Sequence, residues 1–184
     1  PSTMTSGPAN STAAASSWFL NKIVSADGTD IITFQYETET YSYFSWSTFP
    51  IPNYTGSWTT LAQKNGVDLI KNFVNGVRLS QISFPDGTVT FAPSATPRQD
   101  LSGGYTANSG MTDVANTNSF SLGNITISDN EGYCKKFLFK YSYWIDNVNT
   151  GFLNTFWSTN LDGYNLQRDR YCLRLDEVQE TACD

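Results

Sequence analysis

The chain has 184 residues, of which 15% are aromatic and 15% are charged, against a usual charged share of about 25%. Its net charge of −6 and its scattered Lys and Arg residues disfavour nucleic acid and anionic membranes as partners. Histidine is absent, which excludes Ser-His-Asp and Cys-His catalysis and disfavours a zinc site. No run approaches the roughly 20 apolar residues that span a bilayer, so we expect no membrane insertion.

The chain begins with a stretch that is almost free of large apolar residues. Residues 1–17 consist mostly of Ser, Thr, Ala, Gly, Pro and Asn, a composition that cannot bury enough apolar surface to fold. We therefore expect a flexible leader over residues 1–17. Residues 18–184 are long enough for one domain with its own core.

A phrase made of two alternating apolar runs joined by a short polar turn occurs three times. The turns are Asp27-Gly28, Asp86-Gly87 and Asn130-Glu131-Gly132. Asp-Gly between alternating runs is the strongest short-range signal for a tight hairpin, because Gly accepts the positive φ that such turns need. The repeated phrase predicts an all-β fold of stacked antiparallel hairpins with long aromatic loops between them.

Two segments between the first and second copies have turn chemistry. Residues 45–60 contain Pro50 and Pro52, which argue against a central strand and predict an aromatic, proline-braced loop. Residues 61–77 contain Asn65-Gly66 and Asn75-Gly76, which predict a short inserted hairpin.

The remaining segments are two irregular stretches and a final strand. Residues 95–117 and 145–168 are rich in Gly, Ser and Asn, so we expect irregular structure there. Residues 169–180 look like the opening strand of a fourth unit. We expect the strand around Leu173 to Val178 to be an open edge that pairs with a following repeat or a neighbouring chain, unless its charged residues block that edge.

Several phrases resemble the YD-repeat (RHS-like) surface and secreted proteins of Bacteroidota. They are Leu20-Asn21-Lys22-Ile23 before Asp27-Gly28, Leu79-Ser80-Gln81-Ile82 before Pro85-Asp86-Gly87, Arg98-Gln99-Asp100-Leu101, the run Lys135 to Tyr143 and the run Tyr171 to Val178. The resemblance covers residues 18–180, although the Gly-x-x-x-Arg-Tyr-x-Tyr-Asp phrase of standard YD repeats is missing. It implies a hairpin array forming a repeat sheet or shell segment, secreted or at the cell surface, with any catalytic domain separate.

Three cysteines leave at least one thiol without a partner in the chain. Cys134 and Cys172 both lie in strand-like runs, and Cys183 is next to the last residue. We expect a disulfide between Cys134 and Cys172 in an oxidising compartment, with Cys183 left for an intermolecular bond. The alternative is three unrelated thiols.

Acidic residues offer only weak candidates for chemistry. Asp162, Asp169, Asp176 and Glu177 fall near Trp144 and Trp157, but the simpler interpretation is solvated turn and edge acids. Residues 146–151 and 27–30 have oxygen ligands near a Gly but lack the alternate spacing of a calcium loop, which favours turn chemistry. We therefore expect no catalytic residue, metal or other cofactor.

Loop aromatics are the most credible binding residues. Aromatic rings beside Asn, Ser and Thr suit sugar faces or a protein partner, although they can also pack as a small core over the sheet ends. The candidates are Trp46, Tyr54, Trp58, Phe156 and Trp157. The sequence thus predicts a non-catalytic structural or interaction segment of an extracellular protein, or alternatively a carbohydrate-binding module that uses these rings.

Overall fold

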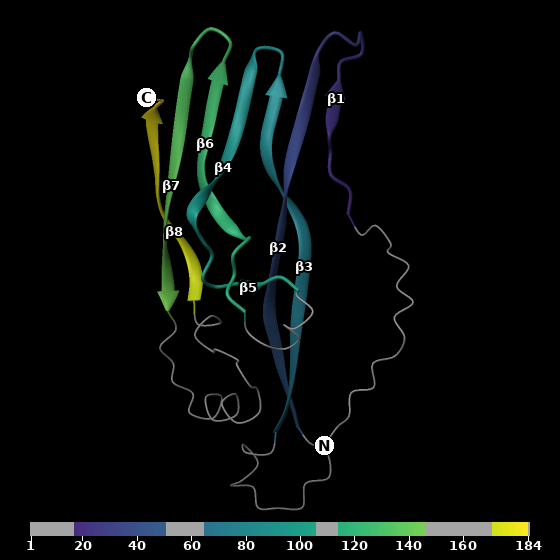
Figure 1. Ribbon diagram of the computed structural model, residues 1–184, viewed down its shortest axis with the longest axis vertical. Helices are drawn as coiled ribbons and strands as arrows, with labels where there is room; N and C mark the ends of the chain where they lie inside the picture. The colour runs from purple at the N-terminus through teal and green to yellow at the C-terminus, as the bar shows by residue number, and fades with distance from the viewer. Residues whose placement is uncertain (1–16, 51–64, 106–113, 146–170, 184) are drawn as a thin grey trace, which may run out of the picture.

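A computed structural model describes residues 17–50, 65–105, 114–145 and 171–183. The strands are β1 (Lys22–Val24), β2 (Ile31–Pro50), β3 (Asn65–Phe84), β4 (Gly87–Pro97), β5 (Ser102–Gly103), β6 (Phe120–Asp129), β7 (Cys134–Ile145) and β8 (Tyr171–Ala182). They form one antiparallel sheet in the order β1-β2-β3-β4-β6-β7-β8, with β5 added to β2 (Figure 1). The predicted all-β fold of stacked hairpins is confirmed.

The three predicted turns are hairpin tips, and they lie together at one end of the sheet (Figure 1). Gly28 between β1 and β2 has a φ of 76°, and Gly132 between β6 and β7 has a φ of 96°. Both glycines therefore adopt the left-handed backbone that the sequence pattern indicates. Neighbouring tips are also joined, because Asn130 donates from its backbone N to the Asp86 carbonyl oxygen at 3.0 Å.

The β3–β4 tip needs its glycine for a different reason from the one expected. The turn is Pro85-Asp86, and Gly87 is already the first residue of β4, without a positive φ. A Cβ on Gly87 would lie 3.0 Å from the Cα of Asp129 and nearer still to the carbonyl oxygen of Ser128, both on β6. The position therefore requires Gly because β6 approaches the backbone closely.

Strands β2 and β3 form a long twisted ribbon, which corrects two sequence predictions. Residues 65–77 of the predicted inserted hairpin belong instead to one strand, since β3 is continuous from Asn65 and Gly76 pairs with Glu39 of β2. Residues 45–50 of the predicted loop over residues 45–60 are part of β2, which continues to Pro50, and the rest of that segment lies outside the described residues. Pairing along the whole length of the ribbon outweighs the local turn preference of Asn-Gly, and Pro50 is tolerated at the last strand position.

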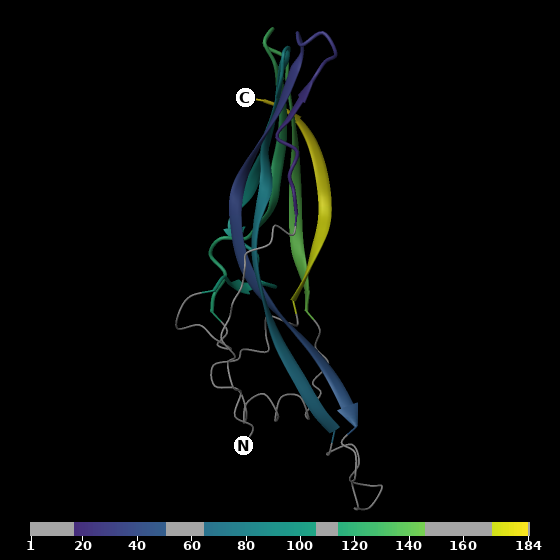
Figure 2. The same cartoon turned by 90° about the vertical axis from the view of Figure 1, so that its right-hand side faces the viewer.

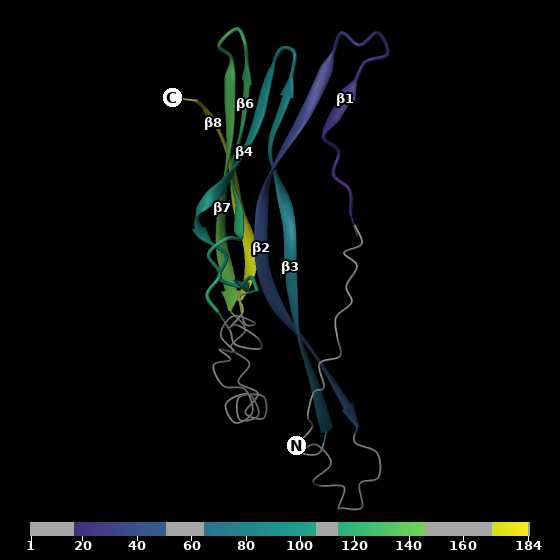
Figure 3. The ribbon, with the colours of Figure 1, turned by 45° about the vertical axis from the view of Figure 1, so that its right-hand side comes forward.

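The ribbon twists so that β2 and β3 cross between the two ends of the sheet (Figures 1 and 3). A register shift between Gln35 and Tyr36 marks a bulge, which increases local twist. After the bulge, the side of β2 that does not face β3 pairs with β5. Strand β5 lies inside the segment 95–117, which was expected to be irregular. Viewed from the side, the strands overlap near the hairpin tips, whereas at mid-height β2 and β8 curve away from each other (Figure 2).

The buried centre of the described region is small and largely polar. Phe44 and Leu101 are its buried apolar side chains, beside buried Ser42, Ser102, Asn116 and Ser119. Ser42 donates from Oγ to the Gly103 carbonyl oxygen at 2.6 Å, which joins β2 to β5. These contacts connect the ribbon to the rest of the sheet.

The two faces of the sheet differ in chemistry. Residues paired across strands share a face, and one row runs Phe34, Ile82, Val89 and Ile127. The next row along the strands lies on the opposite face and consists of Thr33, Ser83, Thr88 and Ser128. In these rows, one face is apolar and the other presents hydroxyl groups.

Candidate interaction edge

Strand β8 ends the strand order, and within the described ranges it pairs with β7 alone. The strand predicted around Leu173 to Val178 is thus confirmed as part of β8 and lies at a sheet edge. The pairing with β7 extends from Tyr171 opposite Ile145 to Ala182 opposite Lys135. Its other side presents a row of backbone N–H and C=O groups, which can pair with a further strand.

The apolar face of β8 continues that of β7. Leu173 lies opposite Tyr143, and Val178 lies opposite Phe139. Val178 is 51% exposed and Leu175 is 50% exposed, although both are on strands of a sheet. The apolar face therefore reaches the edge without being covered there by the described residues.

A bulge in β8 sets which of its residues share a face. Lys140 pairs with Glu177 and Tyr141 pairs with Leu175, so Asp176 is an extra residue on β8. Side chains alternate along a strand, and the extra residue shifts the alternation by one position. Leu173 and Val178 consequently point to the same face, and so do Arg174 and Glu177.

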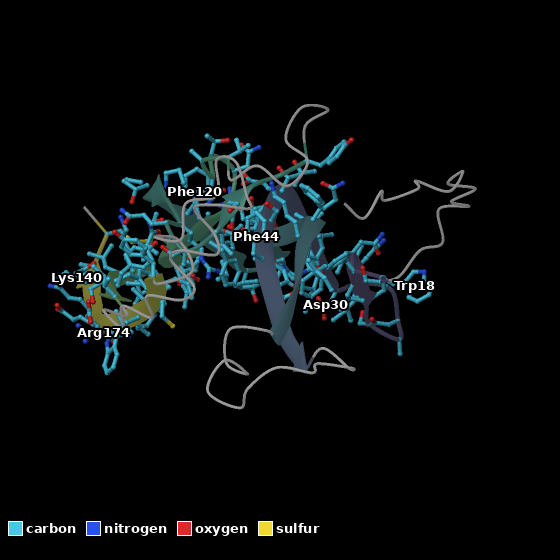
Figure 4. The ribbon with its side chains drawn as sticks, turned by 90° about the horizontal axis from the view of Figure 1, so that it is seen from below. Trp18, Asp30, Phe44, Phe120, Lys140 and Arg174 are labelled. Carbon is cyan, nitrogen blue, oxygen red and sulfur yellow. A yellow bond between two sulfur atoms is a disulfide. The ribbon has the colours of Figure 1, made fainter. Side chains whose placement is uncertain are left out.

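Each charged side chain of β8 has a partner within the β7–β8 hairpin. Glu177 accepts from Lys140 Nζ at 3.0 Å, and Glu180 pairs with Lys135 Nζ at 2.8 Å. Lys140 and Arg174 lie together on this side of the molecule (Figure 4). Charged side chains that project past a sheet edge hinder the pairing of a further strand. The charged side chains of β8 instead form ion pairs within the β7–β8 hairpin.

Arg174 is held by two neighbours. Its Nε donates to Asp176 Oδ1 at 2.6 Å, and its guanidinium carbon lies 5.8 Å from the ring centroid of Trp144. The Ser142 hydroxyl, and then Arg174, hold the pKa of Asp176 below its ordinary value. The hydrogen bond from Lys135 to Glu180 raises the pKa of that lysine. Both contacts therefore favour the charged forms of Asp176 and Lys135.

The disulfide differs from the predicted one. Cys134 bonds Cys183 with a Cα–Cα distance of 5.6 Å, while Cys172 is free and exposed. Because β7 and β8 are antiparallel, Cys134 at the start of β7 meets the end of β8, and Cys172 lies opposite Trp144 at the other end. The prediction of a Cys134–Cys172 bond with Cys183 left over was therefore wrong. The actual bond fixes β8 to β7.

Most of the predicted aromatic binding residues lie outside the described residues. These are Tyr54, Trp58, Phe156 and Trp157. The backbone of Trp46 pairs with Leu69 in the ribbon, and its side chain also lies outside the described part. The carbohydrate hypothesis therefore stays a prediction.

The acidic candidates divide in the same way. Asp162, Asp169 and residues 146–151 lie outside the described residues. Asp176 and Glu177 are engaged in the ion pairs of the edge. Within the described ranges no group of three or more Cys, Asp or Glu side chains is arranged to hold a metal ion. In the same ranges no helix is long and apolar enough to cross a membrane.

The turn over residues 27–30 has the hydrogen bonds of a polar turn. Asp27 Oδ1 accepts from Ser25 Oγ at 2.5 Å and from the backbone N of Thr29 at 3.2 Å. These donors lower the pKa of Asp27, with Ser25 as the main cause. Its carboxylate thus organises the first hairpin tip.

A small cavity that the sequence did not indicate lies where β3 and β4 diverge. It measures about 140 Å³ and is lined by Glu39, Arg78, Leu79, Phe91, Ala92, Pro93, Phe120, Ser121 and Leu122. Its two charged groups have protein partners: Arg78 pairs with Glu37, and Glu39 accepts from Ser119 Oγ at 2.5 Å. Protein side chains therefore engage both charged groups of the cavity. Cross-strand register brings these residues together, and no local pattern encodes it.

No protein-family model, curated protein or solved structure matches this chain. Conclusions about function therefore depend on the geometry of the sheet and its edge.

Proposed function

We propose that this chain is a non-catalytic structural and interaction module of an extracellular YD-repeat-like protein. Its role is to extend a β-sheet by pairing β8 with a strand from a neighbouring repeat or chain. Strand addition suits such an edge because backbone hydrogen bonds supply affinity and alternate side chains supply specificity.

One observation carries the proposal: among the described residues β8 is an edge strand, and its charges are paired with residues of its own hairpin. Twelve residues of strand are available, from Tyr171 to Ala182. The apolar side chains Leu175 and Val178 are half exposed beside that edge. An incoming strand would therefore gain both backbone pairing and apolar contact.

The disulfide supports an extracellular setting. A bond between Cys134 and Cys183 is compatible with an oxidising compartment, where such bonds persist. It also joins the last residues of β8 to the start of β7, so the edge strand is held in register while a partner binds.

A labelled strand peptide tests the proposal. The probe has the sequence of residues 135–145, which is the strand that β8 already accepts on its inner side. We expect saturable binding, measured by fluorescence anisotropy, that is lost when Leu173→Lys and Val178→Lys are combined. Val24→Lys on β1, the strand at the other end of the sheet, is the matched control and should bind as the parent does. Equal binding by both variants, or none by the parent, contradicts the proposal.

A further inference from the structure

We infer that the strand accepted by β8 is β8 of a second copy of this chain, paired antiparallel about a two-fold axis. The inference rests on the proposed function and names its partner. In the inferred register, Leu173 lies opposite Val178 of the second copy, and Arg174 lies opposite Glu177 of the second copy. The two-fold axis repeats each of these pairs.

The bulge makes this self-pairing possible. Without the extra residue Asp176, Leu173 and Val178 would point to opposite faces, because side chains alternate along a strand. With it, both lie on the apolar face and Arg174 and Glu177 both lie on the other. A symmetric pairing then matches these two pairs, and at the axis it places the bulge residues Leu175 and Asp176 opposite Asp176 and Leu175 of the second copy.

The pairing extends rows of side chains that exist already. On the apolar face, Phe139 and Val178 of one copy continue into Leu173 and Tyr143 of the other. On the polar face, Lys140 and Glu177 continue into Arg174 of the other copy. That row alternates in charge, and opposite charges on neighbouring strands stabilise a sheet.

Shifting the pairing toward the C-terminus of the second copy brings acidic residues together. A shift of one residue in one direction places Asp176 opposite Asp176 of the second copy. A shift of two residues in that direction places Asp176 opposite Glu177 of the second copy. Like charges directly opposite each other destabilise a sheet, and a shift of one residue also exchanges the faces. The inferred register places no like charges opposite each other, despite the net charge of −6 on each copy.

The free thiol of Cys172 provides a direct test, because Gln179 of the second copy lies opposite it in this register. Cys172 and Gln179 are both exposed. In the variant Gln179→Cys we expect mild oxidation of the full chain to give a covalent dimer linked from Cys172 to the introduced thiol. The matched control Val178→Cys places a thiol on the opposite face and should give at least tenfold less of that link. Peptide mass spectrometry identifies the linkage and verifies that Cys134–Cys183 is intact.

The outcomes separate this inference from the proposed function. A dimer from Gln179→Cys but not from Val178→Cys, with a doubled solution mass for the unmodified chain, supports both. Equal linkage in the two variants, linkage of Cys172 to itself alone, or a monomer at every concentration overturns the second-copy inference. If the labelled peptide still binds β8 in that case, the proposed function stands; if it does not, both fail.

Discussion

Replacing Gly87 by Ala tests the close approach of β4 and β6. The new Cβ would fall 3.0 Å from Asp129 Cα and closer to the carbonyl oxygen of Ser128, and both are backbone atoms of a strand paired on two sides. Such atoms cannot move aside as a flexible side chain can. Overpacking of this kind costs about 1–3 kcal/mol, and the ordinary gain from replacing a strand Gly by Ala, about 0.5–1 kcal/mol, offsets part of it. We expect a net loss of roughly 1–2 kcal/mol in the free energy of unfolding.

Two other glycines provide the controls. At Gly76 the nearest atom to a new Cβ is Val74 Cγ1 at 3.8 Å, so Gly76→Ala should be neutral or stabilising by about 0.5 kcal/mol. At Gly28 nothing lies within 4 Å but φ is +76°, so Gly28→Ala should cost about 1 kcal/mol through backbone conformation alone. Urea unfolding with linear extrapolation measures all three. Similar values for Gly87→Ala and Gly76→Ala would refute the steric argument.

Three further predictions concern covalent, polar and charged contacts. Cys183→Ser should lower the free energy of unfolding by about 4 kcal/mol, the chain-entropy value for a disulfide with a sequence separation of 49 residues. Cys172→Ser should change it by less than about 0.5 kcal/mol. Thermal unfolding measures both variants. Asn116→Ala should cost about 2–3 kcal/mol in urea unfolding because the buried amide bonds four backbone groups, while the exposed Asn118→Ala should cost less than about 1 kcal/mol. The lowered pKa of Asp27 contributes stability that is present above the pKa of the unfolded state and is lost as pH falls through the pKa of the folded state. Asp27→Asn should therefore lose less stability than the parent between about pH 5 and pH 2. Equal losses would count against the turn contacts.

Local signals were sufficient for the hairpin tips and insufficient for the pairing beyond them. Gly28 and Gly132 are in turns that a few neighbouring residues specify, and both have the expected backbone. Gly76 follows Asn75, which is also a local turn signal, yet its pairing with β2 keeps it in an unbroken strand. The competing effect is tertiary: an antiparallel partner supplies hydrogen bonds at every position, which a local pattern does not reveal.

The strand at the candidate edge could be predicted in outline because its apolar residues from Leu173 to Val178 are visible in the sequence. Its chemistry could not, because the ion pair of Glu177 with Lys140 depends on the β7–β8 register and on the extra residue Asp176. The same register decides that Cys134 meets Cys183. Register is a property of two strands together, so a single strand's composition does not determine it.

Hydrogen exchange in β8 at rising protein concentration tests whether a second copy of the chain pairs with this strand. We expect backbone amides between Leu173 and Val178 to gain protection as concentration rises, in parallel with a doubling of solution mass, while amides of β1 do not. Protection of β8 that is the same at every concentration, in a chain that keeps the mass of one copy, would contradict it.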